Sequence, residues 1–180
     1  VMSGIADDER AYQAMESVTE LLLKDYGTLL NFPAFTKPRS DIGYVTRYAP
    51  GLRENGGVYT HAATWSVWAY ALMDQPELAY EAYRRICPPN RSADIERYWA
   101  EPYVTPGNID GPQSEYYGRG GWTWYTGSAQ WLHYVATHWI LGIRPREEGL
   151  LVDPSIPAEW QGFKVKRTFR KANYFFNVEN

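Results

Sequence analysis

A stretch rich in glycine and aromatic residues, GRGGWTWYTGS, runs from Gly118 to Ser128 and combines hydrogen-bond donors with flat rings. A helical pattern follows it directly, so Thr126, Gly127 and Ser128 are expected at a helix N-terminus. The first backbone N–H groups of a helix lack partners and its dipole is positive there, which makes this end a natural anion site. Gly127 would let a ligand approach the backbone closely. From position alone, ordinary capping by Thr126 or Ser128 is the simpler interpretation.

A second loop also leads directly into a helical pattern and carries polar side chains at that point. Thr60 and His61 open another helical pattern, directly after a loop that contains residues 53–57, RENGG. The nitrogens of a histidine in a first helical turn face outward, although a single histidine is more often packed or solvated than a ligand. His133 and His138 fall inside a later helical pattern and are assigned to packing. The three histidines and one cysteine have no metal-ligand spacing, and no GxSxG, phosphate-loop or dinucleotide motif occurs.

The composition narrows the class of function. The chain has 180 residues, about one domain, and 44% of them are hydrophobic, enough for a packed core. Eight Trp and fifteen Tyr are typical of sugar-binding proteins, and also of a large aromatic core. A net charge of −3 argues against a nucleic-acid partner, and no apolar run approaches the roughly 18 residues that span a membrane. The single cysteine, Cys87, is expected to be buried and favours a reducing, cytoplasmic location.

Hydrophobic periodicity predicts the elements that must position these residues. Four helices are predicted over residues 7–26, 61–73, 74–86 and 128–141, the third opening with a capping box at residues 74–77. Alternating patterns typical of strands follow Arg144 in LLVDPSIP, FKVKRTFR and ANYFFNVEN. Two long ordered loops, 28–58 and 88–121, are expected between the helices, and loops of that length are usually functional. No internal repeat is visible.

This order of elements predicts a mainly α fold with a β tail. Residues 1–143 would form the helical part and residues 144–180 the β part. Four helices with two very long loops bury themselves poorly alone. The chain also opens directly into a helical pattern without a signal-like segment, so a segment of a longer polypeptide is expected.

Three motifs follow one another in the order ENGGVYTHAATW (54–65), EPYVTPGNI (101–109) and GRGGWTWYTGSAQW (118–131). With LLVDPSIPAEWQGFKVKRTFR, they resemble the carboxy-terminal part of the cellobiose phosphorylase family, the inverting glycoside phosphorylases of glycoside hydrolase family 94. That family also includes cellobionic acid and chitobiose phosphorylases and the phosphorylase-like part of cyclic β-1,2-glucan synthase. The resemblance extends from about residue 28 to the last residue.

The resemblance implies a fold and an activity. Residues 1–143 would supply the last helices of an (α/α)6 catalytic barrel, and residues 144–180 the start of a carboxy-terminal β-sandwich domain. The activity implied is cleavage of a β-glucosyl disaccharide, cellobionic acid or cellobiose, by inorganic phosphate to give α-glucose 1-phosphate. Phosphate is then a co-substrate, and no cofactor or metal is expected. The expected partners are the disaccharide, phosphate, the rest of the same polypeptide and a second copy in a homodimer, with no nucleic acid or membrane.

The same resemblance assigns site residues. Phosphate-binding roles fall on His61, Thr126 and Gly127, and substrate-binding roles on Arg53, Glu54 and Trp122. The family's general acid is an Asp in a Trp-Asn-Asp motif upstream of this region, and no such motif occurs in this chain. No catalytic residue is therefore assigned, and the isolated chain is expected to be inactive.

The acceptor sugar is less clearly indicated. Four basic residues gather in the first loop: Lys37, Arg39, Arg47 and Arg53. A solvated basic loop is one interpretation, and a subsite for the carboxylate of an aldonic acid is the other. Arg53 falls where cellobiose-specific members tend to carry Lys, and Pro106-Gly107 replaces more polar residues, so cellobionic acid is favoured over cellobiose.

Other interpretations stay open. Glu54 and Glu101 are read as partners of sugar hydroxyls or of the loops, with a simple salt bridge as the alternative. A non-catalytic carbohydrate-binding or structural helical module would explain the aromatic residues and the missing acid equally well. The phosphorylase-like domain of a cyclic glucan synthase is a third interpretation. A requirement for phosphate separates an enzyme from a binding module.

Overall fold

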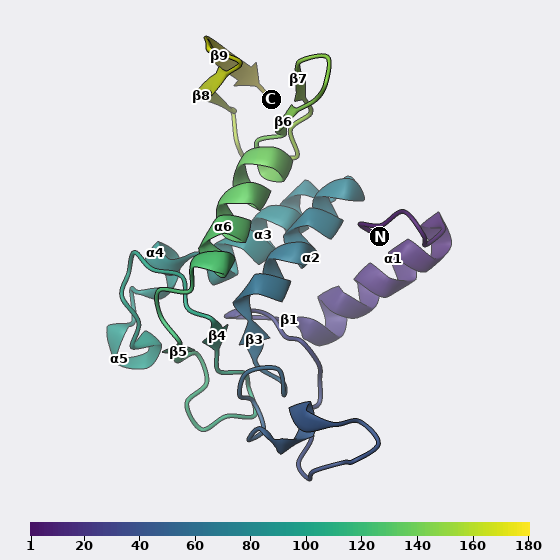
Figure 1. Ribbon diagram of the computed structural model, residues 1–180, viewed down its shortest axis with the longest axis vertical. Helices are drawn as coiled ribbons and strands as arrows, with labels where there is room; N and C mark the ends of the chain where they lie inside the picture. Colours follow the sequence, from purple (N-terminus) through teal and green to yellow (C-terminus); the bar gives the residue numbers. More distant parts are fainter.

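The computed structural model describes residues 1–180 and combines helices with four small antiparallel sheets (Figure 1). The longer helices are α1 (Asp8–Ser17), α2 (Thr60–Leu72), α3 (Pro76–Ile86) and α6 (Thr126–Val135). Two single-turn helices, α4 (Pro88–Arg91) and α5 (Ile95–Tyr98), lie in the second long loop. The helices do not close into a barrel within this chain.

Helix α2 is the centre of the helical layer and packs against both α3 and α6. Its middle is fully covered, with Val67 and Tyr70 completely buried in the larger core cluster. Met15 of α1 reaches the same cluster, and the hydroxyl of Thr19 lies 2.9 Å from the hydroxyl of Tyr70. Apolar burial of this kind is the main source of stability in such a layer.

The predicted helices are found, with corrections at their ends. The first helix stops at Ser17, continues as a π-helical turn over Val18–Leu22, and never reaches the predicted end at residue 26. Helix α6 likewise continues as a π-helical turn, Ala136–Ile140. The predicted capping box before α3 is wrong, since Gln75 is the N-cap and no side chain caps it, although Pro76 does occupy the first turn.

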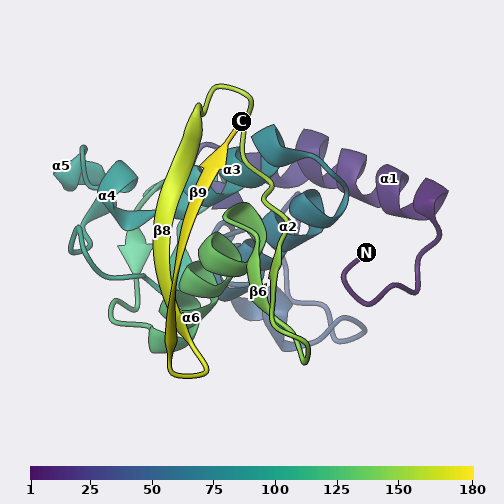
Figure 2. The ribbon, with the colours of Figure 1, turned by 90° about the horizontal axis from the view of Figure 1, so that it is seen from above.

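The predicted β tail is present. Strands β6 (Ile143–Pro145) and β7 (Leu150–Val152) form one hairpin, and β8 (Gly162–Phe169) and β9 (Ala172–Glu179) form a longer one. Both hairpins lie at the end of the molecule where α6 finishes, and Figure 2 shows the long β8–β9 pair from above.

Two further sheets in the helical part were not predicted. Strands β1 (Leu23–Lys24) and β2 (Gly27–Thr28) pair after α1. A three-stranded sheet is made by β3 (Val58–Tyr59), β4 (Asn108–Ile109) and β5 (Gly120–Gly121), in the order β3–β4–β5. Strands of two residues carry no alternation that a sequence pattern could reveal. The chain is therefore not purely helical before residue 143.

The three-stranded sheet ties the two long loops to the helical layer. Its residues Val58 and Ile109 are completely buried in a second core cluster with Ile86 of α3 and Leu132 of α6. Because β3 leads directly into α2, and β5 precedes α6 by a short loop, this sheet decides where both helices begin.

Candidate functional site

The N-termini of α2 and α6 lie side by side at the edge of the three-stranded sheet. The backbone N–H of Thr60 donates to the carbonyl of Gly107 (3.0 Å), and the N–H of Tyr125 donates to the carbonyl of Thr105 (3.0 Å). One buried segment, residues 105–107, therefore binds the first residue of α2 and the residue that precedes α6. Figure 1 shows β3, β4 and β5 gathered at the ends from which α2 and α6 start.

His61 and Gly127 meet across this junction. A Cβ atom built on Gly127 would lie 3.8 Å from Nδ1 of His61, the one atom outside its own helical turn within 4 Å. The imidazole is also held by aromatic neighbours: it stacks on the ring of Tyr59 and contacts the rings of Trp65 and Trp131 at centroid distances of 5.5 and 5.8 Å. The predicted phosphate residues on the two helices are thus brought together.

Neither helix start is capped by a side chain. The N-cap residues are Tyr59 and Tyr125, and no side chain accepts from the first turn of α2 or of α6. The interpretation of Thr126 or Ser128 as an ordinary cap is wrong, because α6 begins at Thr126 and both residues lie inside its first turn. The hydroxyl of Ser128 is buried without a hydrogen-bond partner.

The electrostatic consequence follows from the helices themselves. Apart from the Thr60 N–H, which is bound to Gly107, the two uncapped first turns leave N–H donors without side-chain partners, and two helix dipoles add positive potential in the same place. Thr126 is exposed beside them and carries a hydroxyl donor. The arrangement suits an anion with several oxygen atoms.

The three predicted substrate residues also come together. The guanidinium of Arg53 lies over the ring of Trp122, 4.0 Å from its centroid, and 4.6 Å from the ring centroid of Tyr48. Nε of Arg53 is 3.6 Å from a carboxylate oxygen of Glu54, so the simple salt bridge considered for Glu54 is present. The Trp122 side chain remains largely exposed beside this pair.

Both loops that carry these side chains contain strained backbone. Arg53, Trp122 and Trp124 have φ values of 50°, 55° and 62°, in the left-handed region that non-glycine residues rarely adopt. Each such residue costs roughly 1–3 kcal/mol and persists only where its surroundings impose it. The surroundings of Arg53 include Gly57, whose missing Cβ would lie 2.6 Å from the Arg53 carbonyl oxygen.

The first loop is fixed from within by Asn55, which is completely buried. Its amide accepts from the N–H of Phe35 (2.7 Å) and donates to the carbonyls of Phe35 (2.9 Å) and Tyr48 (2.7 Å). This network holds the two ends of the loop around Arg53, so the loop is ordered although it has little regular structure.

Two of the three other basic residues of the first loop, Arg39 and Arg47, have neighbours of their own. The Arg39 guanidinium binds the carboxylate of Asp41 at the surface, and Arg47 lies 5.9 Å from the ring centroid of Tyr44. Lys37 is exposed. Arg53 alone among the four lies against Trp122.

Two carboxylates, Glu101 and Asp110, serve the second loop. Glu101 accepts from the indole N–H of Trp124 at 3.0 Å. Asp110 is buried and accepts from the hydroxyl of Ser114 (3.1 Å) and from Arg119 (3.3 Å). Burial raises the pKa of Asp110, and its two partners oppose that shift.

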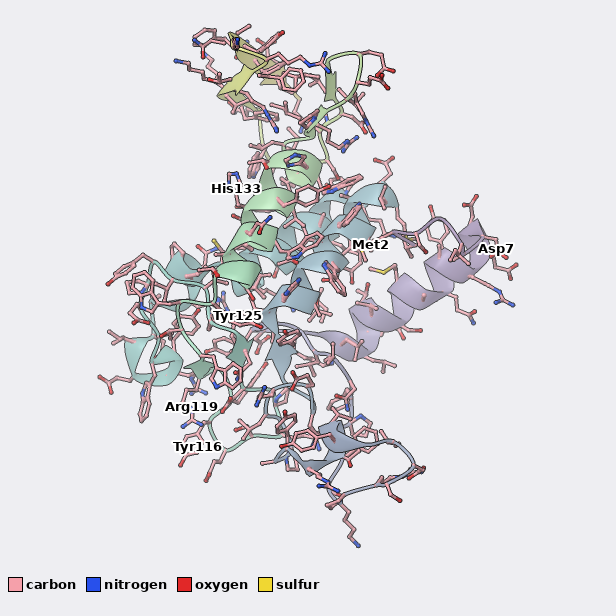
Figure 3. The ribbon with its side chains drawn as sticks, viewed as in Figure 1. Met2, Asp7, Tyr116, Arg119, Tyr125 and His133 are labelled. Atoms are coloured by element: carbon pink, nitrogen blue, oxygen red, sulfur yellow. The ribbon has the colours of Figure 1, made fainter.

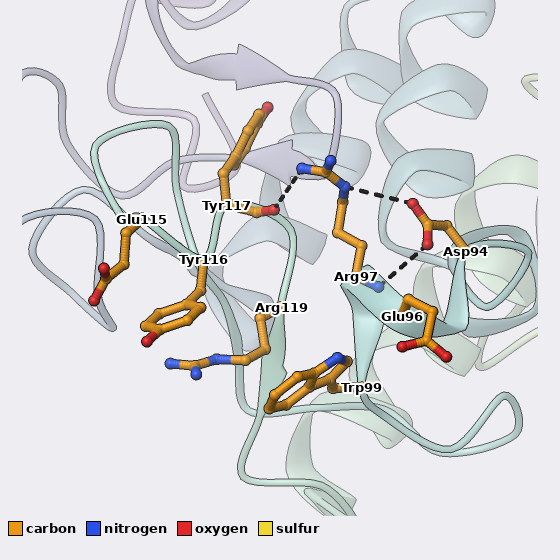
Figure 4. Close-up of a pocket in the computed structure, with 8 residues that line it drawn as sticks. All are labelled: Asp94, Glu96, Arg97, Trp99, Glu115, Tyr116, Tyr117 and Arg119. Carbon is orange, nitrogen blue, oxygen red and sulfur yellow. Dashed lines mark hydrogen bonds and ion pairs between the residues drawn. The ribbon is translucent and has the colours of Figure 1, made fainter.

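A separate cavity of about 300 Å³ opens beside α5 (Figure 4). It is lined by Asp94, Glu96, Arg97, Trp99, Glu115, Tyr116, Tyr117 and Arg119. None of the predicted site residues lines it. Figure 3 shows Tyr116 and Arg119 on the loop below, apart from Tyr125 at the start of α6.

Sequence reasoning missed the two tyrosines at the helix starts. Their hydroxyl oxygens are 3.2 Å apart, and this hydrogen bond is the largest cause that raises the pKa of Tyr59 to about 12. A signal was present: YTHAATW (59–65) and YTGSAQW (125–131) share Tyr, Thr, Ala and Trp at matching places.

Comparison with known proteins gives a consistent picture. The family model "Glycosyl hydrolase 94 superfamily, catalytic domain" matches residues 1–142. N,N'-diacetylchitobiose phosphorylase of Vibrio proteolyticus is 40% identical over 180 residues, which is 100% of this chain and 22% of that protein. The cyclic beta-(1,2)-glucan synthase NdvB of Rhizobium meliloti is 42% identical over 170 residues, 92% of this chain and 6% of that protein.

A third relative, cellobionic acid phosphorylase of Neurospora crassa, is 31% identical over 183 residues, 99% of this chain and 23% of that protein. The chain thus spans about a quarter or less of the length of these relatives. None of the helices described is both long enough and apolar enough to cross a membrane.

Proposed function

This chain belongs to the glycosyl hydrolase 94 superfamily, and on that premise we propose that it is a segment of an inverting glycoside phosphorylase. Matched relatives named as disaccharide phosphorylases support phosphorolysis in general. The proposed reaction is cleavage of a β-glucosyl disaccharide by inorganic phosphate, with α-glucose 1-phosphate and the free acceptor sugar as products.

The observation that carries the proposal is the pair of uncapped helix starts with His61 between them. His61 on α2 faces Gly127 on α6, and neither first turn is capped by a side chain. Phosphate at this junction would accept from the backbone N–H groups of both turns, from the Thr126 hydroxyl and from the imidazole. Donors that are fixed before the ligand arrives need no reorganisation during the reaction.

The chemistry divides between this chain and the rest of the polypeptide. A phosphate oxygen attacks the anomeric carbon from the face opposite the glycosidic bond, and that bond breaks with inversion. The leaving oxygen takes a proton from a carboxylic acid. Phosphate is itself the nucleophile, so no side chain has to activate a water molecule. This chain would hold the nucleophile, and an aspartic acid elsewhere in the polypeptide would supply the proton.

We propose that Arg53, Glu54 and Trp122 contact the acceptor sugar. The ring of Trp122 and the guanidinium of Arg53 offer a flat surface and charged donors. These features favour an acidic acceptor, as in cellobionic acid, over cellobiose. The cellobionic acid phosphorylase relative supports this choice, whereas the chitobiose phosphorylase relative is more similar to the chain.

Several properties of the whole protein are part of the proposal. Residues 1–143 would belong to an (α/α)6 barrel, residues 144–180 would open a β-sandwich domain, and the complete enzyme would be a cytoplasmic homodimer. The match to the family's catalytic domain supports the first of these.

A second candidate rests on the relative from Rhizobium meliloti. At 42% identity over 170 residues, the chain could equally be the phosphorylase-like domain of a cyclic β-1,2-glucan synthase. In that case β-1,2-linked glucans, rather than cellobionic acid or cellobiose, would be the substrates that phosphate cleaves.

The direct test is a substrate panel with the complete polypeptide. Cellobionic acid, cellobiose, chitobiose and a β-1,2-glucan are each incubated with and without inorganic phosphate, and the sugar phosphate is identified by NMR. The proposal expects α-glucose 1-phosphate from cellobionic acid or cellobiose, only with phosphate. Release of free glucose without phosphate would contradict it, and reaction of the β-1,2-glucan alone would establish the second candidate.

A further inference from the structure

The two helices of the candidate phosphate site begin with the same local design. Tyr59 before α2 has φ −78° and ψ 102°, and Tyr125 before α6 has φ −82° and ψ 90°. Each tyrosine is followed by a threonine and, six residues later, by a tryptophan. Ser, Thr, Asp or Asn at an N-cap would bind the free N–H groups of the first turn, and a tyrosine there leaves them free.

The two side chains meet instead of capping. Their hydroxyl oxygens are 3.2 Å apart, and the ring centroids lie 6.5 Å apart with the planes tilted by 56°. The contact joins residues 66 positions apart in the chain, so it links one helix start directly to the other. No other side-chain hydrogen bond joins the start of α2 to the start of α6.

Tyr59 also reaches the groups that would bind ligands. Its ring stacks on the imidazole of His61, with 22° between the planes. The charge of Glu54 raises the pKa of its hydroxyl and the charge of Arg53 lowers it. Tyr59 is thus in direct contact with the candidate phosphate residue His61.

Tyr59 keeps its phenol proton over the physiological pH range. The hydrogen bond to Tyr125 is the largest of the causes that raise the pKa of Tyr59 to about 12, followed by burial. A neutral phenol can both donate and accept a hydrogen bond, so Tyr59 can take part in this contact at neutral pH.

We propose that the Tyr59–Tyr125 hydrogen bond is a positioning element that sets the distance between His61 on α2 and the first turn of α6. This inference rests on the proposed function, because it assigns the spacing of the phosphate site to a specific pair. Without the bond, the two helix starts would still form and stay uncapped. The imidazole and the α6 N–H groups would then no longer be held at the spacing that one anion bridges.

The test uses the complete polypeptide with Tyr59→Phe, Tyr125→Phe and the double substitution. Phenylalanine keeps the ring and its packing and removes only the hydroxyl. A neutral hydrogen bond contributes about 1 kcal/mol, so the KM for phosphate should rise roughly three- to tenfold in each single variant. The KM for the disaccharide should stay unchanged. Because one bond is lost in every case, the double variant should match the single ones.

A matched control is Tyr70→Phe, which removes another tyrosine–hydroxyl contact of α2, the one to Thr19 in the core. It should lower the melting temperature and leave the phosphate KM unchanged. A merely structural role for Tyr59 and Tyr125 predicts the same behaviour for their variants, and that result would overturn the inference. Additive effects in the double variant would also overturn it, since they would mean two independent contacts.

The wild-type enzyme separates this inference from the proposed function. If wild-type protein forms glucose 1-phosphate and His61→Ala raises its phosphate KM, the site stands, and unchanged tyrosine variants refute the positioning role alone. If wild-type protein forms no sugar phosphate from any disaccharide, the proposed function fails and the positioning role fails with it.

Discussion

Arg53 is held by three neighbours whose chemistry defines what it can still bind. Two aromatic rings, those of Trp122 and Tyr48, cover the guanidinium, and the carboxylate of Glu54 lies beside its Nε. A stacked guanidinium keeps its remaining N–H donors in the plane, directed away from the rings. Glu54 is the competitor, since it already balances the charge that an acidic sugar would seek.

Replacing Arg53 should affect kcat/KM differently for the two candidate substrates. Arg53→Ala in the complete enzyme should reduce kcat/KM for cellobionic acid by about one to two decades and leave cellobiose almost unchanged. A hydrogen bond to a charged group contributes about 1.5–3 kcal/mol, which corresponds to that range. Steady-state kinetics on both substrates measure the split.

The matched control is Arg39→Ala, which removes an exposed arginine of the same loop that is already bound to Asp41. It should change neither substrate. Equal losses for both substrates in Arg53→Ala would mean that Arg53 serves sugar hydroxyls or the fold of the loop.

At the scale of the element, the start of α6 combines a glycine with free space. Gly127 lies in the first turn, and a Cβ there would meet only His61 Nδ1 at 3.8 Å. A methyl group would therefore fit into the folded protein and occupy the space between the two helix starts. Alanine is also the better helix former, by up to about 1 kcal/mol.

Gly127→Ala should consequently weaken phosphate binding without destabilising the protein. The melting temperature should stay the same or rise slightly, while the KM for phosphate rises severalfold because the methyl group intrudes on the anion. Gly149→Ala is the control, since a Cβ there would meet nothing within 4 Å. A destabilised Gly127→Ala variant with normal phosphate KM would show that Gly127 serves packing.

The limits of these helices show which features the sequence could predict. Helices α2 and α3 begin and end within one or two residues of their predicted limits, because apolar periodicity and Pro76 mark them. The start of α6 was predicted two residues late, since Thr126 and Ser128 resemble caps. Residue types could not show that a tyrosine would occupy the N-cap position and leave the turn open.

The candidate site was predictable only in part, for a reason of distance along the chain. His61 and Gly127, like Arg53 and Trp122, are brought together by strands β3, β4 and β5 of two residues each. Such short strands leave no pattern, so the sequence could nominate the residues but not their pairing. The similarity of the segments that begin at Tyr59 and Tyr125 was the one local signal for that pairing.

At the scale of the whole molecule, the chain would supply only part of the proposed phosphorylase. It spans 22% of the chitobiose phosphorylase it matches, and its helices do not close into a barrel. The β8–β9 hairpin leaves Phe175 76% exposed. Glu101 and Asp110, two carboxylates of the second loop, are engaged in ordering it.

The isolated 180-residue chain should therefore show no measurable phosphorolysis. A positioned general acid contributes about 10²–10⁴-fold, and the resemblance to the family assigns that acid to a motif outside this chain. An assay for glucose 1-phosphate with purified chain and cellobionic acid or cellobiose measures this, with the complete polypeptide as the positive control. Product release by the chain alone would show that it contains the acid.

The central claim, that phosphate binds between the starts of α2 and α6, is tested most directly at His61. The KM for phosphate is measured in the complete enzyme for wild type, for His61→Ala and for His133→Ala, an exposed histidine farther along α6 (Figure 3). His61→Ala should raise the phosphate KM about 10- to 100-fold, as the loss of a hydrogen bond to a charged group predicts, with a much smaller effect on the disaccharide KM. His133→Ala should match wild type. An unchanged phosphate KM in His61→Ala would contradict the account.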